Sequence, residues 1–151
     1  YDDPDRFPPF ADYFDVFRNH LDNRIRSTVS FELGRSLTAN CGSLIARVLY
    51  VKPGAAETFV ILDAGMTELM RPALYHAYHR IENLTSQGKE KKYTVVGPVC
   101  EPTATFGRFI PLPETRRGDL IAIRSAGAYG EVMASRYNMR ALPETVFSDS
   151  L

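Results

Sequence analysis

Short apolar runs separated by glycine and proline turns fill the chain from about residue 43 onward, and their close spacing limits the fold more than any other feature. The runs over 42–54 and 57–65 predict two strands of an antiparallel hairpin joined at 53–56. Many short strands at close spacing are typical of a β-barrel or a β-sandwich. Further strands are predicted over 76–85 and 93–99, and over 118–130, where the strand runs into a turn of small residues.

The segments between these runs predict turns and irregular structure. Pro72 limits a helix on its N-terminal side, so 66–75 is predicted to be a short helix or irregular. The charged stretch 87–92 is typical of a polar turn, and residues 100–113 are predicted to be irregular. The last stretch, 132–147, is predicted to begin irregular or helical and to end as a strand.

The first forty residues have a different pattern. The spacing over 10–25 puts the apolar side chains on one face of a helix. A short strand is predicted over 27–34, closed by Gly34. An α/β barrel can end with a helix, a strand and a glycine turn in this order. The fold class is therefore mainly β with some α: a β-barrel or β-sandwich domain preceded by the last helix–strand unit of a barrel. The helix face consists of Phe10, Tyr13, Phe14, Phe17 and Leu21.

Composition and charge exclude several classes of protein. The chain has 151 residues, enough for one domain with a hydrophobic core. Its formal net charge of zero gives no indication of binding to nucleic acid or to an anionic membrane. No apolar run reaches the roughly 18 residues that a membrane-spanning helix needs. The two cysteines, Cys41 and Cys100, do not make a disulfide framework, so we expect free thiols and a cytoplasmic protein.

Two clusters of polar residues have two interpretations each. Just past a predicted strand, Glu32, Gly34 and Arg35 combine a backbone that can approach a phosphate with a guanidinium that pairs with phosphate oxygens. The alternative is an ordinary turn with surface charges. Arg71 and Tyr75 are four residues apart, so a local helix would put them on one face, where together they can hold a carboxylate. The alternative is a turn that faces solvent.

A thiol and a carboxylate stand side by side at Cys100 and Glu101, directly before Pro102. A cysteine with a tuned pKa transfers protons, whereas many free cysteines are simply small buried hydrophobic residues. Alternation along a strand would turn the two side chains to opposite faces, but Pro102 indicates that the strand has already ended. Tyr129, between small residues, either lies against a flat ligand or fills a tight turn. The histidines lack a metal-ligand spacing, so no metal site is predicted.

Five segments occur in a fixed order: ELGRSLTANCGSLIARVLYVK, ILDAGMTELMRPALYHAYHRIENL, VVGPVCE, GDLIAIRSAGAYG and SRYNMRALPETV. Together they resemble the C-terminal part of the diaminopimelate decarboxylase family, which belongs to the pyridoxal-phosphate decarboxylases with an alanine-racemase-like fold. The resemblance extends over roughly residues 29–147. Five ordered segments are far more specific than any one of them.

The resemblance implies two domains and a reaction. Residues 1–40 would be the incomplete end of an N-terminal (β/α)8 barrel, and residues 41–151 would be a C-terminal β-domain. The implied cofactor is pyridoxal 5′-phosphate, and the implied reaction converts meso-2,6-diaminopimelate to L-lysine and CO2. Related decarboxylases of ornithine, arginine or carboxynorspermidine share the fold. A non-catalytic β-domain that serves dimerisation is the alternative outside this chemistry.

The resemblance also implies roles for single residues. Glu32 would face the pyridine nitrogen of the cofactor, and Gly34 and Arg35 would lie at its phosphate. Cys100 would be the catalytic acid that returns a proton to the α-carbon. The implied cofactor-binding residues are Glu32, Leu33, Gly34, Arg35 and Tyr129, and the implied substrate-binding residues are Arg35, Arg71, Tyr75, Glu101 and Tyr129.

The far end of the substrate and the assembly follow from the same resemblance. Arg71 and Tyr75 would bind the distal end of diaminopimelate, and Glu101 would bind its distal ammonium. In the family the site lies at the interface of a homodimer. Cys100 and Glu101 would therefore be supplied to the barrel of the partner.

Several positions depart from the usual residues of the family. Leu33 replaces a proline, Ser125 replaces an aspartate, and Ala104 replaces an acid, which would weaken the orientation of the Cys100 side chain. The chain begins with Tyr1 rather than Met, which suggests a piece of a longer protein. The lysine that forms the Schiff base with the cofactor belongs to the barrel, so we expect this chain to be inactive alone. A chain that lacks the rest of its barrel would expose apolar surface, and we therefore expect it to self-associate.

Overall fold

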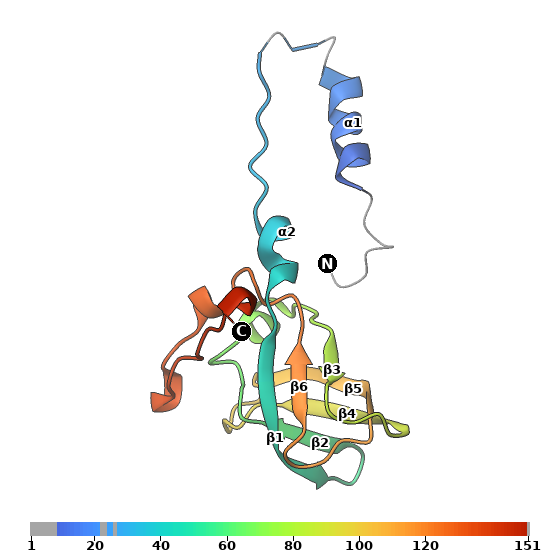
Figure 1. Ribbon diagram of the computed structural model, residues 1–151, viewed down its shortest axis with the longest axis vertical. Coiled ribbons are helices and arrows are strands. Elements are labelled where there is room, and N and C mark those ends of the chain that lie inside the picture. Colours follow the sequence, from blue (N-terminus) through green and yellow to red (C-terminus); the bar gives the residue numbers. More distant parts are fainter. Residues whose placement is uncertain (1–8, 22–23, 26, 151) are drawn as a thin grey trace.

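Six strands dominate the structure, a computed structural model that describes residues 9–21, 24–25 and 27–150. The strands form one sheet in the order β3-β6-β1-β2-β4-β5, which rolls into a nearly closed barrel (Figure 1). The prediction of a mainly β chain with a barrel or sandwich domain is confirmed. The strands are β1 (Leu44–Pro53), β2 (Thr58–Leu62), β3 (Ile81–Asn83), β4 (Glu90–Val96), β5 (Thr105–Pro113) and β6 (Leu120–Ile123).

The ten-residue strand β1 joins two parts of the barrel because it changes partner along its length. Its first half pairs antiparallel with β6, with Leu44 opposite Ile123, and its second half pairs antiparallel with β2, with Val51 opposite Val60. The predicted hairpin is thereby confirmed. β2 also pairs in parallel with β4, which pairs antiparallel with β5. The strand predicted over 76–85 is present as β3, limited to three residues.

The barrel nearly closes where β3 and β5, the two ends of the sheet, come into contact. Gly107 of β5 faces this seam: a Cβ added there would lie 2.7 Å from Ile110 Cδ1 and 3.6 Å from Ile81 Cδ1. Alternate residues of a strand point to the same face, so the inward side chains of all strands can form one core. The core includes Val48, Val60, Leu62, Val95, Leu112, Ile121 and Ile123.

Two predictions for the middle of the chain are wrong. The stretch 100–113, expected to be irregular, contains β5, and the predicted turn 87–92 contains the start of β4. Proline lacks an N–H donor and is tolerated at the edge of a sheet, which is where β5 lies. Charged residues are accepted at the start of β4 because their side chains are exposed to solvent. One of them, Lys91, donates a hydrogen bond to Glu114 at 3.0 Å, and this bond lowers the pKa of the Glu114 carboxyl from its ordinary value.

The N-terminal segment stands apart from the barrel (Figure 1). The helix α1 (Phe10–Leu21) confirms the predicted helix, and the rings of Phe14 and Phe17 pack edge-on against Phe31, each with 4.9 Å between centroids. The strand predicted over 27–34 is wrong, because this segment pairs with no strand among the described residues. A strand persists only where a neighbour satisfies its backbone groups. The division of the chain at residue 40 stays a prediction.

Short helical elements precede β1 and follow β2. α2 (Arg35–Thr38) and the 3-10 turn η2 (Ala39–Cys41) lead into β1, and α3 (Arg71–Tyr75) carries Pro72 in its first turn, where proline is tolerated.

Within the part of the chain that the structure describes, no helix combines the length and the apolar character needed to cross a membrane.

The C-terminal segment runs along the outside of the barrel (Figure 1). The prediction that 132–147 ends as a strand is wrong, because this stretch joins no sheet of the described residues. Its backbone is left-handed at Asn138 (φ 54°) and Met139 (φ 59°), which interrupts any extended run. The segment instead contains the 3-10 turns η3 (Glu131–Met133), η4 (Tyr137–Met139) and η5 (Ser148–Ser150).

Candidate functional site

The turn after β6, residues 126–130, packs directly on α2 and η2 at one end of the barrel. Gly127 makes this contact possible, because a Cβ at this position would lie 2.1 Å from the Thr38 carbonyl oxygen and 2.8 Å from Cys41 Sγ. The Gly127 N–H also donates to the Ala39 carbonyl at 2.9 Å. The turn and the α2–η2 segment therefore support each other. We call this pair of segments the α2 support.

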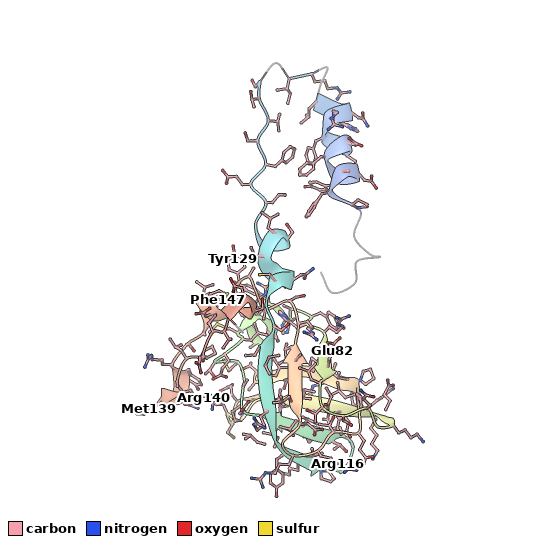
Figure 2. All side chains as sticks on the ribbon, in the orientation of Figure 1. Glu82, Arg116, Tyr129, Met139, Arg140 and Phe147 are labelled. Carbon is pink, nitrogen blue, oxygen red and sulfur yellow. The ribbon has the colours of Figure 1, made fainter. Side chains whose placement is uncertain are left out.

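The α2 support carries Tyr129 on its outer side, beside α2 (Figure 2). Tyr129 has a left-handed backbone (φ 57°), which is rare for a bulky residue, and it is about half exposed (49 %). Gly130 permits the tight turn, since a Cβ there would lie 2.2 Å from the Ala126 carbonyl oxygen. The Ser125 hydroxyl fixes the start of the turn by donating to Asn40 Oδ1 at 2.9 Å. Backbone strain of this kind persists where the surroundings hold it and clusters at binding sites.

The other predicted cofactor residues stand at the start of α2. Gly34 is the N-cap of this helix (φ −99°), and a Cβ added to it would meet no described atom within 4 Å. Its backbone is therefore accessible to a ligand. Arg35 and Leu33 are half-buried on either side of Gly34, and Glu32 is exposed. Glu32, Leu33 and Gly34 thus directly precede α2, Arg35 begins it, and Tyr129 lies in the turn that packs on α2 and η2.

Arg71 and Tyr75 lie at the two ends of α3 and share one face, as their four-residue spacing predicts. The guanidinium carbon of Arg71 lies 5.3 Å from the centroid of the Tyr75 ring, which is a cation–π contact. Arg71 is half-buried and Tyr75 is exposed. His76 ends the helix with a left-handed backbone (φ 51°). A half-buried guanidinium beside an exposed tyrosine suits a carboxylate.

Cys100 and Glu101 lie in a tight loop beyond the end of β4, residues 97–104, which we call the Cys100 loop. Cys100 is exposed and Glu101 is half-buried. The Ala104 N–H donates to the Glu101 carbonyl at 2.9 Å, and the Gly97 N–H donates to the Ala104 carbonyl at 2.7 Å. Backbone hydrogen bonds thus close the loop, with the side chain of Ala104 buried (3 %).

The turn between β2 and α3, residues 63–70, supports both α3 and the Cys100 loop. It continues directly into α3, and its Gly65 packs on the loop: a Cβ at Gly65 would lie 3.2 Å from Pro98 Cδ. Thr103 Oγ1 of the loop also lies 3.4 Å from Met66 Sδ of the turn. Arg71, Tyr75, Cys100 and Glu101 therefore share one support, which we call the 63–70 turn. The other two predicted substrate residues, Arg35 and Tyr129, lie on the α2 support, and Glu32 and Gly34 directly precede it.

An ion pair between the 63–70 turn and the C-terminal segment was missed by sequence reasoning. Glu68 is 7 % exposed and Arg140 is 28 % exposed, and their Oε1 and Nε atoms lie 2.9 Å apart. The two residues are 72 positions apart in the chain, so no local spacing connects them. The one signal was Glu68 itself, a charged residue between Met66 and Met70 in a short stretch whose other members are uncharged.

A cavity of about 470 Å³ lies between the α2 support and the C-terminal segment. Cys41 and Gly127 line it on one side, Phe147 on the other, and Glu68 also borders it. Figure 2 shows Phe147 and Tyr129 at the same end of the barrel. None of the predicted site residues lines this cavity. Among the residues described, no group of three or more His, Cys, Asp and Glu side chains has an arrangement that could hold a metal ion.

The residues of the α2 support fit a phosphorylated aromatic cofactor by their chemistry. An accessible glycine backbone beside a guanidinium suits a phosphate, because both supply hydrogen-bond donors to its oxygens. A carboxylate such as Glu32 suits a protonated ring nitrogen, and an exposed ring such as Tyr129 suits a flat ligand. The open space at Gly34 leaves room for such a group. The donor set is therefore compatible with pyridoxal phosphate.

Comparison with known proteins identifies the class of protein to which this chain belongs. The sequence profile of the family described as "Pyridoxal-dependent decarboxylase, C-terminal sheet domain" matches residues 1–127. This chain belongs to that family.

Several relatives of this chain are diaminopimelate decarboxylases of bacteria. The diaminopimelate decarboxylase of Bacteroides thetaiotaomicron is 56 % identical over 144 residues, which cover 95 % of this chain and 37 % of the relative. The crystal structure of diaminopimelate decarboxylase from Helicobacter pylori complexed with L-lysine is 43 % identical, with a TM-score of 0.83 over 94 % of this chain and 35 % of that one. A crystal structure from Aquifex aeolicus is 38 % identical, with a TM-score of 0.83 over 89 % and 34 %. This chain spans about a third of the length of these relatives.

Proposed function

We propose that this chain is the C-terminal part of a pyridoxal-phosphate-dependent decarboxylase that converts meso-2,6-diaminopimelate to L-lysine and CO2. The observation that carries the proposal is the 63–70 turn, which supports both α3 and the Cys100 loop. Diaminopimelate has an amino-acid group at each end, so its site needs a cation and a carboxylate for the end that does not react. Arg71 and Glu101 have these charges, and the similarity to diaminopimelate decarboxylases supports the assignment.

In this proposal the α2 support binds the cofactor. Gly34 and Arg35 hold its phosphate, and Glu32 pairs with the protonated pyridine nitrogen, with Leu33 between them in the chain. Tyr129 lies against both cofactor and substrate, and Arg35 also reaches a substrate carboxylate. When bound, pyridoxal phosphate supplies a sink for the electrons that remain when CO2 leaves.

The residues on the 63–70 turn bind the substrate and complete the reaction. Arg71 and Tyr75 bind the distal carboxylate, and Glu101 accepts hydrogen bonds from the distal ammonium. Cys100 donates a proton to the α-carbon after the carboxylate has left. The exposure of Cys100 in a closed loop leaves its Sγ accessible to a substrate held by another part of the protein.

We propose further that the protein is a cytoplasmic homodimer whose subunits each contain an N-terminal (β/α)8 barrel. Each site is then composite, with residues from both subunits. The support for this is that Cys100, Tyr75 and Tyr129 are all exposed and lie outside the cavity beside the α2 support. The chain has lysine only at 52, 89, 91 and 92, in β1, in β4 and just before β4. These positions are remote in the fold from α2, so this chain alone is expected to be inactive.

The function is tested by assaying the full-length protein with meso-diaminopimelate, ornithine, arginine and carboxynorspermidine. We expect kcat/KM for diaminopimelate to exceed the other three values by about 10⁴-fold, because a site built to pair with distal charges rejects substrates that leave those charges unpaired. A preference for one of the other three substrates would contradict the assignment. Absence of CO2 release from all four by a folded dimer would favour the dimerisation module instead.

Replacement of Glu101 by glutamine in the full-length protein is expected to raise KM for diaminopimelate by about 10- to 100-fold, because a charge-assisted hydrogen bond to the ammonium is lost. Cofactor content should be unchanged, since Glu101 is not on the α2 support. Glu90→Gln is the matched control, because Glu90 is exposed at the start of β4. An unchanged KM in steady-state assays of Glu101→Gln would exclude its role at the ammonium.

A further inference from the structure

Arg140 ties the C-terminal segment to the 63–70 turn. Its Nε atom lies 2.9 Å from Glu68 Oε1 and 3.1 Å from Thr67 Oγ1, and its Nη2 atom donates to the Asp63 carbonyl oxygen. In Figure 2, Arg140 lies between the barrel and Met139, which is 98 % exposed. The Ser135 N–H adds a hydrogen bond to the Thr67 carbonyl at 2.9 Å. One guanidinium thus contacts the 63–70 turn at three positions.

Glu68 is already oriented for this partner by the turn itself. Its Oε2 atom accepts hydrogen bonds from the Gly65 N–H at 2.6 Å and from Thr67 Oγ1 at 2.7 Å. One carboxylate oxygen therefore organises the turn, while the other faces Arg140. A carboxylate that is 7 % exposed is strongly disfavoured without its cation. Loss of Arg140 would leave this carboxylate without its cation and force Glu68 to reorient, and its bond to Gly65 would weaken.

Gly65 is the residue through which this change would reach the Cys100 loop. The backbones of the turn and the loop meet here: a Cβ at Gly97 would lie 2.6 Å from Gly65 Cα and 3.2 Å from the Ala64 carbonyl oxygen. At the other end of the turn, the Leu74 N–H of α3 donates to the Met70 carbonyl at 3.0 Å. A shift of the turn therefore has to move α3, the Cys100 loop or both, because packed backbones have no free space to absorb it.

We propose that Arg140 is a positioning residue for the decarboxylation, acting through Glu68 on α3 and the Cys100 loop. This inference rests on the proposed function. Arg140 itself has no contact with substrate in this proposal. It holds the support on which Arg71 and Cys100 are presented, and a small misplacement of such groups lowers the rate strongly.

The test compares Arg140→Ala, Arg140→Lys and Arg136→Ala in the full-length protein. Arg140→Ala is expected to lower kcat/KM for diaminopimelate by about 10- to 100-fold, with KM raised and kcat lowered, while cofactor content per subunit stays at the wild-type level. Arg140→Lys keeps the charge but not the forked contacts and should recover part of the loss. Arg136→Ala, an exposed arginine of the same segment, should match the wild type.

A second readout does not depend on activity. The rate of alkylation by iodoacetamide is measured at Cys100 by peptide mass spectrometry, with a short cysteine peptide added to the same reaction as the reference, because Cys41 lines the cavity beside Glu68 and the C-terminal segment. Arg140→Ala should change the rate at Cys100 relative to this peptide by about threefold or more, because a loosened support alters the exposure of the loop. Arg136→Ala should leave the ratio unchanged.

The proposal is overturned if folded Arg140→Ala keeps both kcat/KM and the alkylation ratio of the wild type. It is also overturned if activity falls only in proportion to lost cofactor or folded protein, with KM unchanged. If Arg140→Ala does not fold, Arg140→Lys is judged by the same two criteria. If the wild-type protein does not decarboxylate diaminopimelate, the proposed function fails, and the alkylation ratio still supports or overturns the positioning of the loop by Arg140.

Discussion

Replacement of Cys100 by alanine in the full-length protein is expected to lower kcat for diaminopimelate by about 10²- to 10⁴-fold, the range that a single general acid contributes. KM and cofactor content should change little, because in the proposed site other residues bind the distal end of the substrate and the cofactor. The loop should keep its shape, since backbone hydrogen bonds close it and the thiol is exposed. The measurement is steady-state CO2 release, with cofactor content determined from absorbance.

Cys41→Ser is the matched control for this prediction. Cys41 is the second exposed free cysteine, and its thiol donates to the Thr38 carbonyl at 2.9 Å, a hydrogen bond that a serine hydroxyl can replace. We expect its kcat to remain within about twofold of the wild type, as for a surface substitution that keeps its hydrogen bond. A Cys100→Ala protein with the kcat of the wild type would exclude Cys100 as the proton donor.

Replacement of Gly127 by alanine is expected to cause the largest loss of stability, about 3 kcal/mol in the free energy of unfolding. The new methyl group would lie 2.1 Å from the Thr38 carbonyl oxygen and 2.7 Å from the Gly42 nitrogen. Both are backbone atoms, which cannot rotate away as a side chain can. The α2 support must therefore separate, and affinity for the cofactor should fall together with stability.

Gly34→Ala is the matched glycine substitution directly before α2. A Cβ at Gly34 would meet no described atom within 4 Å, but its φ of −99° and ψ of −113° lie outside the regions that alanine prefers. The free energy of unfolding should therefore fall by about 1 kcal/mol, clearly less than for Gly127→Ala. Urea unfolding followed by circular dichroism provides the comparison. Equal stability losses in the two variants would show that close packing at Gly127 is not the cause.

Local patterns were sufficient to predict some elements and failed for others. The helix α1 follows from the spacing of its apolar residues, and the β1–β2 hairpin follows from two apolar runs joined by a Pro-Gly turn. β5 could not be predicted this way, because Gly107, Pro111 and Pro113 disfavour an ordinary strand. They are accepted because β5 lies at the edge of the sheet, a position that depends on β4.

The candidate site likewise contains some features that the sequence predicted and others that it did not. The four-residue spacing of Arg71 and Tyr75 was enough to predict their common face, because i and i+4 residues meet on any helix. The pair of Glu68 and Arg140 was not predictable, since it joins residues 72 positions apart. The contact of Gly127 with Thr38 was equally hidden, because a glycine in a small-residue turn does not indicate which backbone it meets.

Periodicity, turn chemistry and the order of motifs are local properties of the chain, and they were enough to predict the family, the mainly β class, the helix α1, the first hairpin and the candidate residues. Three outcomes became visible only in the folded chain: β5 forms, residues 27–34 pair with no strand among the described residues, and the segments around the candidate residues rest on two separate supports. Each of these outcomes depends on a distant partner: a strand edge for backbone donors, a carbonyl against a glycine, or a guanidinium for a buried carboxylate.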